Sequence, residues 1–165
     1  ARILKKAINL ARKYDIPINV DPKIENFMRY KKVTCITPNT AEAIAGMHYH
    51  GPTEDKNIVD LGKKILKKLG TDSVLITRGE KGMTLIEHGN KITHIPTRAK
   101  EVYDVTGAGD TVIATFTLAL AAKANLIQAA EISNFAAGVV VAKLGTATVS
   151  PEELQTAIKN FNKPR

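Results

Sequence analysis

The chain has 165 residues, of which 44% are hydrophobic and 24% charged, a composition that indicates a globular domain and excludes a disordered segment. Its net charge is +8, but aromatic residues make up only 5% and do not interleave with the basic ones, so we favour anionic small substrates over nucleic acid as partners. No apolar run approaches the ~20 residues of a membrane span, and the single Cys35 excludes an internal disulfide. We therefore expect a cytoplasmic protein without a membrane partner.

The first half of the chain alternates helical patterns with short apolar runs. The opening helix should gather its apolar residues on one side. The amphipathic helix at 54–69 should carry Lys63, Lys64, Lys67 and Lys68 on a solvated face and end at Gly70. The expected elements are a helix at 1–14, strands at 16–21 and 33–37, a short helix at 39–45 and an amphipathic helix at 54–69.

The second half begins with a buried strand and a hairpin and ends in three helices. The expected elements are a strand at 73–77, hairpin strands at 83–87 and 91–95, helices at 107–122 and 125–142, and a final helix opened by the capping box of Ser150 and Glu153. This order predicts one α/β domain over 1–165, with a mostly parallel sheet flanked by helices and a late antiparallel hairpin. The opening helix should follow an earlier strand, so we expect a chain truncated on its amino-terminal side.

A glycine-rich turn precedes the helix at 107–122. Gly107 and Gly109 let the backbone approach a ligand closely, and amides at a helix start lack intrahelical partners. The Gly107, Ala108 and Gly109 amides can therefore bind an anion, while Asp110 can take a proton from an attacking hydroxyl. The alternative is a plain helix start capped by Thr106 or Asp110.

The wider motif resembles the signature of the ribokinase-like sugar kinases: Asp104-x-Thr106-Gly107-Ala108-Gly109-Asp110. The resemblance implies that the three amides form an anion hole for the transferred phosphoryl group and that Asp110 is the catalytic base. It also implies that ATP is the phosphoryl donor. Asp104 and Thr106 match positions that bind a monovalent cation in some relatives.

A second motif is Asn39-Thr40-Ala41-Glu42. Asn followed three residues later by Glu is typical of a helix capping box. The same spacing resembles an Asn-x-x-Glu pattern of the family, which implies that Asn39 and Glu42 help to hold Mg²⁺ through ordered water. Mg²⁺ keeps several waters and takes few protein ligands, so both interpretations stay open.

A third motif, Thr77-Arg78-Gly79-x-Lys81-Gly82, ends a predicted strand, and ligands of open α/β sheets collect at such ends. The resemblance implies that this stretch lines the nucleotide site. Arg78 and Lys81 can either contact phosphates or form a solvated turn.

Three further positions are candidates for the same site. Lys23, after Asp21-Pro22, is a candidate phosphate contact, and Asp21 a structural or metal-side acid. The resemblance implies that Asn134 lies beside the adenine and that the 145–148 loop closes over it. The alternative for Asn134 is the packing of a helix rich in small residues.

Within the family, Asp21-Pro22-Lys23 and Gly145-Thr146-Ala147-Thr148-Val149-Ser150 are similar to the heptose 7-phosphate kinase branch, over the carboxyl-terminal half of such a domain. This implies phosphoryl transfer from ATP to the anomeric hydroxyl of D-glycero-D-manno-heptose 7-phosphate, in the ADP-heptose and lipopolysaccharide core pathway. The alternatives are another ribokinase-like sugar or nucleoside kinase and a non-catalytic nucleotide-binding module. The open edge of the strand at 16–20 predicts a homodimer or pairing with the missing amino-terminal half.

Overall fold

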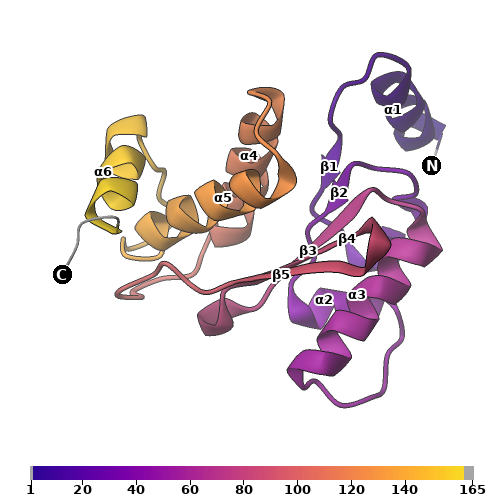
Figure 1. Ribbon diagram of the computed structural model, residues 1–165, viewed down its shortest axis with the longest axis horizontal. Coiled ribbons are helices and arrows are strands. Elements are labelled where there is room, and N and C mark those ends of the chain that lie inside the picture. The colour runs from indigo at the N-terminus through magenta and orange to yellow at the C-terminus, as the bar shows by residue number, and fades with distance from the viewer. Residues whose placement is uncertain (1, 162–165) are drawn as a thin grey trace.

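A five-stranded mixed sheet runs through the computed structural model, which describes residues 2–161 (Figure 1). Its strands follow the chain in the order β1 (Asn19–Val20), β2 (Cys35–Ile36), β3 (Ser73–Thr77), β4 (Met83–Glu87) and β5 (Lys91–Ile95). Strands β1, β2 and β3 are parallel, whereas β4 runs antiparallel to both β3 and β5. The predicted α/β fold with a late hairpin is therefore confirmed.

Helices cover both faces of this sheet (Figure 1). They are α1 (Arg2–Lys13), α2 (Thr40–Gly46), α3 (Asp55–Leu69), α4 (Ala108–Ala121), α5 (Leu126–Val140) and α6 (Pro151–Phe161), with short 3₁₀ turns η1 (Ile24–Arg29), η2 (Gly79–Lys81) and η3 (His88–Asn90). Helices α2 and α3 pack on one face and α4 and α5 on the other, while α6 packs on the outside of α5. Among residues 2–161, no helix combines the length and the apolar character that a membrane span requires.

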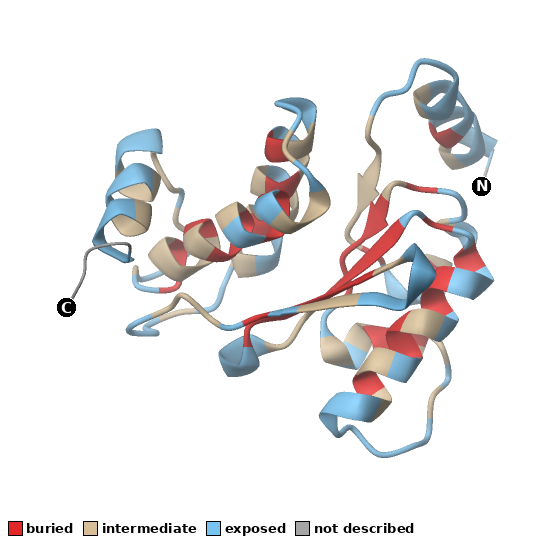
Figure 2. Cartoon of the chain, viewed as in Figure 1, coloured by how far each residue is buried: buried red, intermediate tan, exposed pale blue. Residues whose placement is uncertain are grey.

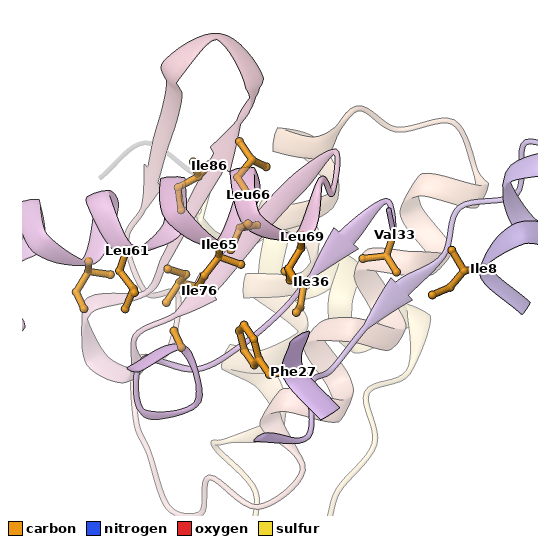
Figure 3. Packing of buried hydrophobic residues seen from close by; sticks show 13 residues of the cluster. Ile8, Phe27, Val33, Ile36, Leu61, Ile65, Leu66, Leu69, Ile76 and Ile86 are labelled. Atoms are coloured by element: carbon orange, nitrogen blue, oxygen red, sulfur yellow. The ribbon is translucent and has the colours of Figure 1, made fainter. Parts of the chain in front are cut away.

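The central strands contribute alternate residues to two hydrophobic cores. Val74 and Ile76 of β3 point into the core under α3, which also contains Phe27 (Figure 3), whereas Leu75 points into the core under α4 and α5 with Phe116. Successive strand residues face opposite sides of a sheet, so a continuous apolar run indicates a strand covered on both faces. Figure 2 shows the resulting buried band through the sheet and the inner faces of the helices.

Local chemistry predicted the helix ends well. In the Asn125 capping box, the Gln128 amide donates to Asn125 Oδ1 at 2.9 Å and the Asn125 amide donates to Gln128 Oε1 at 3.0 Å. Ser150 and Glu153 form the same pair of bonds at the start of α6. Gly70 ends α3 in the left-handed conformation with φ 61°, and the lysines of α3 lie outside the buried face, as predicted.

The amino-terminal edge departs from prediction. The expected strands at 16–21 and 33–37 each shrink to two residues, and η1 was not predicted. The predicted helix α1 is confirmed, but its apolar residues are mostly uncovered, because only Ile8 is buried while Ile3 is 84% and Leu10 60% exposed. Helix α1 is attached near the amino ends of β2 and β3, where Arg12 donates to Lys32 O and pairs with Asp72, and the described chain covers little of its apolar surface.

Candidate active site

The glycine-rich turn leaves three backbone donors free at the start of α4. Gly107 is the N-cap residue, with φ 80° and no side-chain cap. The Ala108 amide donates to Val105 O at 3.2 Å, so one of the three expected anion-hole amides is already used. Within the described chain, the Gly107, Gly109 and Asp110 amides make no hydrogen bond. The Asp110 amide is thus a donor that the motif did not indicate.

The plain-cap alternative for this turn is not what the structure contains, because neither Thr106 nor Asp110 caps the helix. Asp110 instead lies in the first turn with an exposed side chain. Free amides at the positive end of a helix dipole attract an anion, and a carboxylate next to them can accept a proton from a group that attacks it.

Asp104 joins the glycine-rich turn to the 144–148 loop. Its Oδ1 accepts a hydrogen bond from the Thr106 amide at 2.9 Å, and its Oδ2 accepts one from the Gly145 amide at 3.0 Å. Hydrogen bonding from Thr106, and then from Gly145, holds the pKa of Asp104 below its ordinary value. The cation-binding role that the resemblance implied for Asp104 and Thr106 stays a prediction.

A pocket of about 390 Å³ opens beside the turn, between η2, the segment after β5, α4 and α5. Six of the predicted site residues line it: Thr77, Gly79, Gly82, Ala108, Gly109 and Asn134. Apolar side chains, including Met83, Val112 and Val141, complete its wall. Sequence reasoning missed these three because they come from three separate elements and no local pattern connects them.

Asn134 is buried in this pocket wall, with 4% of its surface exposed. Its Nδ2 donates to Pro96 O at 2.7 Å, which ties α5 to the segment after β5. The side-chain carbonyl oxygen therefore remains to accept a hydrogen bond from a ligand. Both expectations for Asn134, helix packing and a ligand contact, are compatible with this geometry.

Arg78 and Lys81 point away from the pocket toward the start of α3. The Arg78 guanidinium pairs with Asp55 and donates to Thr84 Oγ1 at 3.3 Å, and Lys81 Nζ lies 3.3 Å from Asp55 Oδ1. Hydrogen bonds from Arg78 and Lys81 lower the pKa of Asp55. Neither cation lines the pocket, and the side chain of Arg78 is only 6% exposed, so these residues fasten the Gly79–Gly82 turn to α3.

The Asn39 motif lies against the Thr77 motif at the carboxyl end of the sheet. Asn39 bridges Thr77 in parallel register, and the Thr77 amide donates to Pro38 O at 3.0 Å. The predicted capping box is confirmed, because the Glu42 amide donates to Asn39 Oδ1 and the Asn39 amide donates to Glu42 Oε2, each at 2.9 Å. The hydrogen bond from the Asn39 amide uses only one of the two carboxylate oxygens of Glu42.

Three carboxylates from different elements gather at this end of the sheet. The pKa of Asp21, which follows β1, is raised first by burial and then by the charge of Glu42, with a smaller effect from Asp110. The adjacent Lys23, which is exposed and lies outside the pocket lining, lowers it. Within residues 2–161 no three acidic, His or Cys side chains converge closely enough to ligate one ion directly.

The raised pKa predicts how Asp21 affects stability. A carboxyl group that is a weaker acid in the folded state stabilises the fold below its unfolded pKa of ~3.9, and this contribution is lost as the pH rises through the folded value. Asp21→Asn should therefore raise Tm at pH 7 without divalent cations, and the gain should vanish near pH 3. Thermal melts across this range, with exposed Asp60→Asn as the control, check it; a gain that is constant with pH would contradict the prediction.

An α/β sheet covered on both faces thus holds free amides and an acid at the start of a helix beside a pocket, which suits the binding of an anion and the removal of a proton next to it. Residues 1–153 match the pfkB family carbohydrate kinases, and the chain belongs to that family. The recognition of a ribokinase-like kinase from sequence is thereby confirmed.

Among curated proteins, the chain is 46% identical over 158 residues to the bifunctional protein HldE of Proteus mirabilis and 48% identical over 159 residues to HldE of Sodalis glossinidius. Each alignment covers 94% of this chain but 32% of the relative, so the chain spans about a third of the length of these proteins.

Solved structures show the same fold. Ribokinase from Thermotoga maritima matches with a TM-score of 0.77 and 26% identity, over 95% of this chain and 54% of that one. Phosphofructokinase-2 from Escherichia coli, in complex with potassium, matches with a TM-score of 0.82 and 19% identity, over 97% of this chain and 52% of that one. Arabidopsis thaliana ribokinase, complexed with ribose and ATP, also gives a TM-score of 0.82, with 23% identity over 95% of this chain and 52% of that one.

Proposed function

We propose that the chain is the nucleotide-binding and catalytic part of an ATP-dependent kinase for D-glycero-D-manno-heptose 7-phosphate, which acts in ADP-heptose and lipopolysaccharide biosynthesis. The observation that carries the catalytic part is the pair of free amides of Gly109 and Asp110 beside the Asp110 carboxylate, next to the 390 Å³ pocket. The sugar is proposed from the 46% identity to HldE. Another sugar or nucleoside kinase, or a non-catalytic nucleotide-binding module, is the alternative.

In this proposal the pocket holds the adenosine part of ATP and the start of α4 holds the transferred phosphoryl group. Apolar walls such as Val112 and Val141 suit a planar base, and the Asn134 carbonyl oxygen can accept from an exocyclic amine. The Gly109 and Asp110 amides stabilise charge on the phosphoryl oxygens. The Asp110 carboxylate removes the proton from the attacking sugar hydroxyl.

The cluster of Asp21, Glu42 and Asp110 suits a divalent cation. Burial, and after it the negative charges of Glu42 and Asp110, raises the pKa of Asp21, so a positive charge placed among the three carboxylates would relieve an unfavourable interaction. We propose that Asn39 and Glu42 hold Mg²⁺ through water, using the Glu42 oxygen that the capping box leaves free. When bound, Mg²⁺ neutralises charge on the phosphates during transfer. A monovalent cation is proposed near Asp104 and Thr106.

Glu42→Gln separates the metal role from the cap. Gln forms the same box at position 128, so the substitution should keep the cap and leave Tm nearly unchanged while it removes the charge. We expect the Mg²⁺ concentration for half-maximal turnover to rise by about 10–100-fold, the usual effect of losing a group that holds metal-bound water. The control is Gln128→Ala, which should lower Tm but leave the Mg²⁺ concentration for half-maximal turnover unchanged. If this Mg²⁺ concentration is unchanged in Glu42→Gln, Glu42 acts only as part of the helix cap and does not help to hold Mg²⁺.

Alanine substitutions at Gly109 and Gly107 test whether the turn binds the phosphoryl group. A Cβ on Gly109 would meet no heavy atom within 4 Å, so Gly109→Ala should fold normally while its methyl group crowds an anion at the free amides. Gly107 has φ 80°, so Gly107→Ala should destabilise the chain by about 1 kcal/mol through backbone strain. A Gly109→Ala protein with normal Tm and normal turnover would count against the anion hole.

The direct test is substrate-dependent ATP turnover by the polypeptide or complex that carries both the sugar-binding half and these residues. The proposal expects heptose 7-phosphate to be preferred over ribose, fructose 6-phosphate and adenosine. Preference for one of these would identify another kinase of the family. ATP binding without turnover on any sugar, in a protein with an intact Asp110, would identify the non-catalytic module.

A further inference from the structure

The segment after β5 separates two cavities. Thr97 and Ala99 line the 390 Å³ pocket, whereas Arg98 and Lys100 line a second cavity of about 540 Å³ against α5 and α6. Residues of an extended chain face opposite sides alternately. The position of this strip, residues 96–100, therefore determines the shape of both cavities.

Helix α5 holds the strip at two points. Asn134 Nδ2 donates to Pro96 O at 2.7 Å. Gly138 lines both cavities, and a Cβ there would lie 3.0 Å from the carbonyl carbon of Arg98, so helix and strip are in backbone contact. These two contacts fix the strip's backbone on α5 but leave the Arg98 side chain to be held elsewhere.

The Arg98 side chain is held by two aromatic rings. Its Cζ lies 3.8 Å from the ring centroid of Phe161 and 5.2 Å from that of Phe135, and the two rings are packed edge to face at 5.5 Å. Its Nε is buried without a hydrogen-bond partner, and no ion pair of Arg98 occurs among residues 2–161. Within that part of the chain, cation–π attraction is thus the main force on the guanidinium.

Phe161 belongs to the last turn of α6, whose first turn is attached to the body of the protein independently. Lys143 Nζ lies 2.7 Å from Glu153 Oε1, and Ser150 caps the helix. A helix fixed at its start and stacked on Arg98 at its end can hold the strip from the side opposite the pocket. The path runs from Phe161 through Arg98 to Thr97 and Ala99.

We infer that α6 supports the wall of the pocket, with Arg98 and Phe161 as positioning residues that keep Thr97 and Ala99 in the shape that accepts the nucleotide. This rests on the proposed binding of ATP in that pocket. Coupling between two sites is reciprocal, so ATP should in turn tighten the stacking of Phe161 on Arg98.

The first test measures the Kd for Mg·ATP by calorimetry. Phe161→Ala and Arg98→Met should each weaken binding by about 2–30-fold, the range that loss of a cation–π contact allows. Phe161→Tyr keeps an aromatic ring and should retain wild-type ATP affinity. Gln155→Ala, at an exposed position of the same helix, should not alter the affinity either. If Phe161→Ala lowers Tm but leaves Kd within about twofold of wild type, α6 is only a structural attachment and the inference is wrong.

The second test measures Trp fluorescence. The natural chain contains no Trp, so Phe161→Trp introduces a single fluorescent reporter. Trp is the best cation–π partner and should preserve ATP binding. Its emission should change with ATP and reach half of its full change at the calorimetric Kd, whereas unchanged emission with ATP bound overturns the coupling. If the wild-type chain binds no ATP, the proposed nucleotide site is wrong. If the wild type binds ATP and all Phe161 and Arg98 variants bind it equally well, only the inference about α6 is wrong.

Discussion

Asp110→Asn should lower kcat for the sugar phosphate by about 10²–10⁴-fold, the usual contribution of a general base. Asn is almost isosteric with Asp but cannot accept the proton of the attacking hydroxyl. The side chain is exposed and caps nothing, so the substitution should not damage the fold. The Gly109 and Asp110 amides stay in place, so the Kd for ATP should change little.

Steady-state turnover together with ATP calorimetry checks this expectation, in the polypeptide or complex that carries the sugar-binding half. Asp60→Asn, an exposed acid of α3, is the matched control for a lost negative charge. A kcat within about threefold of wild type, well below the range for general-base catalysis, would exclude Asp110 as the base. A loss of turnover caused only by weaker ATP binding would instead place Asp110 among the binding groups.

These 165 residues alone should phosphorylate the sugar poorly, which is the second large effect expected. Orientation of the two reactants can supply about 7–11 kcal/mol of a barrier, and phosphoryl transfer depends mainly on positioning and charge. The chain spans 32% of its HldE relatives and 52% of phosphofructokinase-2. We propose that the sugar is oriented by the amino-terminal part of the kinase domain.

The exposed edge of the sheet supports this proposal. Within the described chain β1 pairs only with β2, and apolar side chains of α1 and of the segment between α1 and β1 are open to solvent: Ile3, Leu10, Tyr14 and Ile16 are 84%, 60%, 61% and 57% exposed. An open strand edge with apolar neighbours invites another strand. We expect either a homodimer or pairing with a separate amino-terminal half.

Two measurements decide this prediction. The first is phosphorylation of the heptose phosphate by this chain, alone and mixed with a separately produced amino-terminal half. The second is the mass in solution by light scattering, with Ile16→Lys as a variant that places a charge at the open edge and should reduce association. A monomer with full turnover would show that the sugar site lies within these residues and that the edge needs no partner.

Sequence alone determined the features that depend on neighbouring residues. The capping boxes at Asn39 and Asn125 and the stop at Gly70 follow from side chains and backbone angles within a few residues, and the hairpin strands from alternation and a tight turn. The glycine-rich turn before Asp110 was recognisable for the same reason. Such features can be predicted without knowledge of the fold because their hydrogen bonds join residues that are only a few positions apart.

Only the tertiary structure decided which distant groups meet. It paired Arg78 with Asp55 rather than leaving it beside the pocket, and it brought Asp21 and Glu42 close to Asp110, in the first turn of α4. Arg98 gave no sequence signal, because its partners lie on α5 and α6. Contacts between distant segments depend on how strands are ordered and helices packed, and periodicity along the chain contains no information on which side chains then become neighbours.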